Sequence, residues 1–175
     1  LVESQDVTIK DGSTSGSGKI EMEFGENLTN VQYPIYISSM GSLTIDGGTF
    51  SSSSNSVNYI ECYGSLTING GTIVSNSTKA VNLIKCEGAN LTITGGKLQI
   101  PHKNEFGISY GYAVYTENHF GDNRQIVITG GEIDGKVAFT RNDSSVTGTP
   151  KYDKLPLKIT GGVFNQKVYA YYSKK

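Results

Sequence analysis

The chain contains 175 residues, of which 18% are charged, and its formal net charge is −1. This length suits a single domain, and the balanced charge offers no basic surface for phosphates, which argues against a nucleic-acid-binding protein. No apolar run approaches the roughly 20 residues that a membrane-spanning helix needs.

One short pattern recurs along the chain: a branched apolar residue, a spacer, Ile, a small polar residue and two glycines. A weaker copy lies at 7–12, and full copies lie at 43–48, 66–71, 91–96, 126–131 and 157–162. Such self-similarity indicates a stack of units, none of which can bury its apolar face alone. The sequence therefore predicts one domain over residues 1–175 with about six coils. Residues 1–30 would form the first coil or an N-terminal cap.

The apolar residues of each copy predict short strands that stack from coil to coil. Leu43 and Ile45, for example, share one face because side chains in a strand alternate with period two. A third apolar position, such as Phe50, follows each glycine pair. A second strand motif precedes each copy; it is best seen at 57–62 and 81–86, with related segments at 34–38, 113–117, 136–140 and 167–171. No segment has the 3.6-residue spacing of a helix. We expect an all-β, single-stranded, right-handed parallel β-helix with nearly no helix.

Two cysteines occupy equivalent positions in the two best-matched strands. Cys62 and Cys86 should lie in register on neighbouring coils, with a Cα separation inside the roughly 4.4–6.8 Å range of disulfides. Three interpretations remain open: a stacked pair of reduced thiols in the core, a disulfide between coils, and metal binding, for which no His lies at ligand spacing. One residue earlier in each strand, Glu61 and Lys85 are expected to form an exposed ion pair.

Two insertions, at 100–125 and 140–156, interrupt the repeat spacing and predict loop excursions from the stack. They concentrate aromatic and charged side chains, which suit a sugar site because aromatic rings pack on sugar faces and charged groups bind hydroxyls or uronates. Alternatively, the aromatic residues only pack the loops onto the stack. The candidate ligand-binding residues are Phe106, Tyr110, Tyr112, His119, Arg124, Arg141, Asp143, Lys151 and Tyr152.

Catalytic chemistry finds little support in the sequence. The loop carboxylates are scattered singly rather than paired as a glycosidase requires, and no nucleophile elbow, zinc motif or phosphate-binding loop is present. We therefore assign no catalytic residue, no metal ligand and no cofactor, with calcium as the one cofactor left open.

The phrases at 43–50, 66–72 and 91–96 resemble the repeats of right-handed parallel β-helix proteins on the surface of gut and soil bacteria. That group includes pectate-lyase-like folds and polygalacturonate-binding β-helix domains. The resemblance implies a secreted or cell-surface bacterial protein whose partner is a polysaccharide or a cell-surface glycan.

The function expected from these observations is a non-catalytic surface module for carbohydrate binding or adhesion. One alternative is a polyuronate lyase-like enzyme that depends on Arg141 or Lys151, and another is a structural spacer or phage tail-fibre segment. The sequence gives no indication of the oligomeric state.

Overall fold

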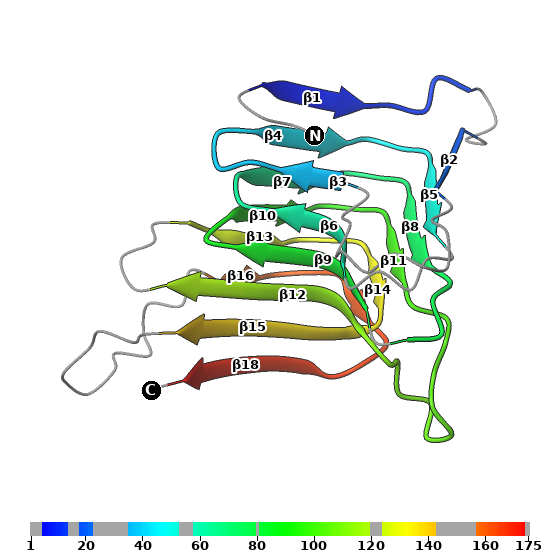
Figure 1. The fold of residues 1–175 in the computed structure, drawn as a ribbon, viewed down its shortest axis with the longest axis vertical. Coiled ribbons are helices and arrows are strands. Elements are labelled where there is room, and N and C mark those ends of the chain that lie inside the picture. Colours follow the sequence, from blue (N-terminus) through cyan, green and yellow to red (C-terminus); the bar gives the residue numbers. More distant parts are fainter. Residues whose placement is uncertain are drawn as a thin grey trace, which may run out of the picture.

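The computed structural model describes residues 5–13, 18–22, 35–52, 58–79, 81–119, 124–142 and 157–173 (Figure 1). These residues form eighteen strands and no helix, which confirms the all-β prediction for this part of the chain. The strands belong to three sheets of six strands, and every neighbouring pair is parallel.

The first sheet contains β1 (Asp6–Ile9), β4 (Ser42–Ile45), β7 (Ser65–Ile68), β10 (Asn90–Ile93), β13 (Ile126–Ile128) and β16 (Leu157–Ile159). The second contains β2 (Lys19–Met22), β5 (Thr49–Ser52), β8 (Thr72–Ser75), β11 (Lys97–Gln99), β14 (Glu132–Asp134) and β17 (Val163–Phe164). The third contains β3 (Ile35–Ile37), β6 (Asn58–Cys62), β9 (Asn82–Glu87), β12 (Tyr112–His119), β15 (Lys136–Asn142) and β18 (Val168–Ser173).

The chain visits these three sheets in rotation, so that each strand lies beside the strand three places later in the sequence (Figure 1). This order is compatible with a parallel β-helix or solenoid. β1 and β2 pair in register with β4 and β5, so the N-terminal segment supplies strands of the first coil.

The predicted inward columns are present in the structure. Ile45, Ile68, Ile93 and Ile128 pair in register and are fully buried. A parallel column continues through Leu43, Leu66 and Leu91, and a third runs on the second sheet through Phe50, Ile73, Leu98 and Ile133. Each such side chain contributes roughly 1.5–3 kcal/mol on burial. Together they form one core that runs through the stack.

The strands predicted at 113–117 and 136–140 are present and run further than expected, so they take up part of the two excursions. Residues 112–119 form β12, which pairs with β9 and β15, and β15 itself extends to Asn142. The strand forms because Val114 enters the core in register with Ile84 and Val137, and the bulge after Tyr112 also buries Ala113. Among the described residues of the two excursions, 101–111 and 124–125 lie outside the three sheets, whereas residues 120–123 and 143–156 are outside the described residues.

The Gly-Gly corners bring backbone against backbone. The second glycine of each full copy has a positive φ, for example +82° at Gly96 and +89° at Gly131, which side chains rarely adopt. The first glycine has a different constraint: a Cβ atom on Gly130 would overlap the carbonyl oxygen of Thr94 in the preceding coil. Glycine is therefore required at both positions, for two separate reasons.

Gly130→Ala tests this corner constraint. We expect it to lower the free energy of unfolding by more than about 2 kcal/mol or to prevent folding, because the Thr94 carbonyl belongs to a packed strand end and cannot move aside. Gly12→Ala is the matched control, because a Cβ there meets nothing within 4 Å. Urea denaturation of both variants measures the difference, and a tolerated Gly130→Ala would contradict the close approach.

The inward column offers a second test. Ile93→Ala should lower the free energy of unfolding by about 2–5 kcal/mol, since Ile93 is completely buried. Ile159→Ala in the same column should lower it by no more than about 1.5 kcal/mol, because Ile159 lies on the edge strand β16 and is 38% exposed. Equal losses in urea denaturation would show that Ile93 does not sit in a sealed core.

Candidate functional site

One outward row of side chains crosses all six strands of the third sheet. Its members pair in register on the face opposite the core, because they alternate with inward residues such as Ile60 and Ile84. We call this row the outer column. It consists of Tyr36, Glu61, Lys85, Tyr115, Ala138 and Tyr169.

The centre of the outer column is a network of charges. Glu61 Oε1 accepts hydrogen bonds from Lys85 Nζ at 3.3 Å and from the Tyr63 hydroxyl at 3.0 Å. Lys85 Nζ also contacts Glu87 Oε2 at 3.2 Å. The second oxygen of Glu61, Oε2, is buried and has no hydrogen-bond partner. This network fixes two carboxylates around a single ammonium group.

The expectation of an exposed Glu61–Lys85 pair is wrong, because Glu61 is only 1% exposed. Tyr36 and Lys85 lie in register on either side of it, and the rings of Tyr36 and Tyr63 are 5.6 Å apart. Bulky neighbours on the same face of the sheet therefore shield a residue that an isolated strand would leave in solvent.

The network also sets protonation states. Burial raises the pKa of Tyr63, and its hydrogen bond to Glu61 raises it further. Burial alone would lower the pKa of Lys85, but hydrogen bonds and charges from Glu87 and Glu61 outweigh it and raise the pKa. Lys85 is consequently an ammonium group at neutral pH, which makes it a poor general base.

Aromatic residues continue this surface toward the start of β12. The rings of Tyr112 and Tyr115 are 5.6 Å apart, and Lys136 Nζ lies 4.7 Å from the centre of the Tyr112 ring. The same ammonium donates to the backbone oxygen of Tyr110 at 3.4 Å. Tyr115 follows Lys85 in the outer column, so the tyrosine pair adjoins the charge network.

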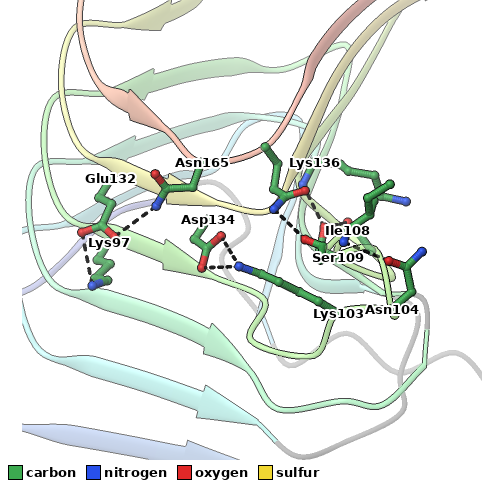
Figure 2. Close-up of polar contacts among 12 residues, drawn as sticks. Lys97, Lys103, Asn104, Ile108, Ser109, Glu132, Asp134, Lys136 and Asn165 are labelled. Carbon is green, nitrogen blue, oxygen red and sulfur yellow. Dashed lines mark hydrogen bonds and ion pairs between the residues drawn. The ribbon is translucent and has the colours of Figure 1, made fainter.

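A hairpin at 101–111 stands beside this end of the third sheet. Lys103 pairs with Ser109 in an antiparallel bridge, and Lys103 Nζ binds the Asp134 carboxylate at 2.8 and 3.0 Å (Figure 2). Lys136 donates its backbone N–H to Ser109 Oγ at 3.1 Å. Below the hairpin lies a pocket of about 400 Å³ that reaches the last coil and is lined in part by Phe106, Lys136 and Tyr169.

The structure brings together only some of the candidate residues from the sequence. Phe106, Tyr110 and Tyr112 lie at or before the start of β12, and Phe106 is 77% exposed. His119 is the last residue of β12, at the opposite end of that strand from Tyr112, and Arg124 follows it shortly before β13. An eight-residue strand is roughly 23 Å long, which separates the two groups.

The remaining candidates stay untested. Arg141 lies near the end of β15, but its side chain is outside the described part of the structure, as is the side chain of His119. Asp143, Lys151 and Tyr152 lie wholly outside the described residues.

Sequence reasoning missed Tyr115, Glu87 and Lys136 as members of a surface. The alignment of 57–62 with 81–86 could have indicated this surface, because it places Glu61 and Lys85 on one outward row. The same row reaches Tyr115 on the next strand.

The described ranges hold no group of three or more His, Cys, Asp or Glu side chains arranged for a metal ion. The part of the chain that the structure describes also contains no helix suited to crossing a membrane. No protein-family model, curated protein or solved structure matches this chain.

Cys62 and Cys86 lie opposite each other on β6 and β9, as their sequence positions predict, and both are fully buried. They are free thiols in this structure, and the alternative disulfide stays a prediction. A hydrogen bond with the Cys62 thiol, together with burial, raises the pKa of Cys86.

Alkylation distinguishes the two states of this pair. The native protein at pH 8 should react slowly with iodoacetamide, because both thiols are fully buried and the reagent cannot reach them. After denaturation without reductant, mass spectrometry should find both cysteines modified. A chain that takes up the reagent only after reduction would instead carry the disulfide.

Proposed function

We propose that this chain is a non-catalytic, right-handed parallel β-helix module of a secreted or cell-surface bacterial protein. It binds a polysaccharide or cell-surface glycan, and so supports adhesion, through the outer face of the third sheet. The observation that carries this proposal is the tyrosine pair, Tyr112 and Tyr115, lying beside the Glu61–Lys85–Glu87 network.

The chemistry of this face suits sugars. A pyranose ring has apolar C–H faces that pack on aromatic rings, and hydroxyls around its rim that need donors and acceptors. The tyrosine pair supplies the rings, while the half-exposed Lys85 and Glu87 supply a donor and an acceptor. Because these groups stand on paired strands, the free protein already holds them in place, which reduces the entropy lost on binding.

One carboxylate oxygen without a hydrogen-bond partner, Glu61 Oε2, adds to this argument. Leaving a buried acceptor unpaired disfavours folding by roughly 1–3 kcal/mol, so Glu61 Oε2 is an unusual feature of the outer column. A surface that retains such a group despite its cost in stability fits a binding role.

The lyase alternative requires a base that removes a proton from the sugar ring. Lys85 does not suit this role, because Glu87 and Glu61 hold it in the protonated form. The alternative relies on Arg141, whose side chain is outside the described residues, and on Lys151, which lies wholly outside them. Incubation with polygalacturonate distinguishes the lyase from the binding module. A rise in the ultraviolet absorbance of unsaturated uronates would favour the lyase.

Replacement of the tyrosine rings tests the proposal directly. Tyr115→Ala and Tyr112→Ala should each weaken glycan binding about tenfold or more on a glycan array, since each removes a ring face at the centre of the surface. Tyr115→Phe should bind nearly as well as the wild type, because it keeps the ring and loses only the hydroxyl.

Thr44→Ala is the matched control, since Thr44 lies on β4 of the first sheet and should not affect the third. Circular dichroism must first show that the variants are folded. If the wild type binds no glycan, or if Tyr115→Ala binds as tightly as Thr44→Ala, the surface does not bind sugar and the spacer alternative gains support.

A further inference from the structure

We infer that the pocket beneath the 101–111 hairpin is a second binding site, distinct from the Tyr112–Tyr115 pair, that takes one anionic group carried on a six-membered ring. The pocket measures about 400 Å³ and lies where the second sheet passes into the third. Its main walls are Phe106, Ile108, Lys136, Phe164, Lys167 and Tyr169.

The charged residues that line this pocket are all positive. Two lysines, Lys136 and Lys167, are among its lining residues, and none of these residues is acidic. Neither lysine forms an ion pair with a carboxylate among the described residues, whereas Lys85, Lys97 and Lys103 all do. Two cations without a counter-charge beside a concave surface favour an anionic ligand.

The walls favour a ring over a bare ion. Phe106 and Ile108 are 77% and 43% exposed, and the aromatic residues Phe164 and Tyr169 line the same pocket. Exposed apolar groups that face one another across a cavity gain free energy when an apolar body fills it. A volume near the lower end for ligand pockets suits a single ring better than a long chain.

The hairpin holds this shape before any ligand arrives. Asn104 Oδ1 accepts hydrogen bonds from the backbone N–H groups of Phe106 at 3.0 Å and Ile108 at 2.9 Å, which fixes the tip. Lys103 anchors one side to Asp134 (Figure 2), and Gln166 Nε2 donates to the Gly107 oxygen at 3.1 Å from the last coil. The hairpin that forms this wall is therefore attached both to β14, through Lys103, and to the last coil, through Gly107.

The pocket and the outer face differ in the ligand groups they favour. The outer face carries Glu61, Glu87 and Glu117 along neighbouring strands, which disfavours an anion there. The pocket instead has lysines and no carboxylate in its lining. An acidic sugar and an aromatic acid share the required chemistry, a carboxylate on a six-membered ring, and both are suitable probes.

Isothermal titration calorimetry with glucuronate, glucose, benzoate, benzyl alcohol and sodium sulfate tests the inference. Glucuronate should bind the wild type about tenfold more tightly than glucose, or benzoate about tenfold more tightly than benzyl alcohol. Lys167→Gln should weaken the binding of that acid about fivefold. Phe106→Ala should weaken the ring acid and leave sulfate unchanged. Lys158→Gln, at an exposed lysine of β16 in the same coil, is the matched control.

The outcomes separate the sources and the two sites. Preference for glucuronate over benzoate identifies an acidic sugar, and the reverse identifies an aromatic acid; either supports the pocket. Tyr115→Ala should leave the binding of these acids to the pocket intact. The pocket inference can therefore hold even if the proposed glycan surface does not. The inference fails if neither acid binds, if sulfate binds as tightly as both, or if Lys158→Gln weakens binding as much as Lys167→Gln.

Discussion

The rest of the structure depends on the hydrogen bond that joins each Gly-Gly corner to the corner of the next coil. The residue after each glycine pair donates its backbone N–H to the preceding coil: Thr72 to Gly48 at 2.8 Å, Lys97 to Gly71 at 2.8 Å and Glu132 to Gly96 at 2.9 Å. These bonds need close approach, and a Cβ atom on Gly71 would lie only 2.7 Å from the Gly48 oxygen. The corner thus fixes the register of successive coils, and register determines which side chains meet in all three sheets.

Register has a second consequence on the outer face, where it joins residues that are distant in sequence. Glu61 and Lys85 meet because β6 and β9 align Cys62 with Cys86 in the core. The core residues thereby position the charge network, and the network in turn buries a carboxylate whose second oxygen has no partner. An apolar pair at these two positions would avoid this desolvation, so stability alone does not account for the arrangement. Residues that lower the stability of the fold where an apolar pair would not are typical of a surface with a binding role.

Repeats made much of this fold predictable. The inward columns, the Cys62–Cys86 register and the near absence of helix follow from a period-two pattern repeated at each corner, which is local information. The burial of Glu61 was not predictable in this way, because it depends on the separate strand that carries Tyr36 and on the side chain of Tyr63. A strand was predictable at 113–117, but β12 continues to His119 because its pairing with β15 runs beyond its pairing with β9. Nor does any local pattern place Gln166 against Gly107, whose contact spans 59 residues.

Tyr169 cannot distinguish the outer face from the pocket in a mutational test. It is the last member of the outer column and also lines the pocket, so a change at Tyr169 would affect both surfaces. Lys136 has the same difficulty, because its ammonium group touches the Tyr112 ring while its side chain lines the pocket. Lys167 lies in the pocket but not on the outer column, and Tyr115 lies on the column but not in the pocket. These two residues therefore distinguish a ligand held by unpaired cations from one held by aromatic rings beside carboxylates.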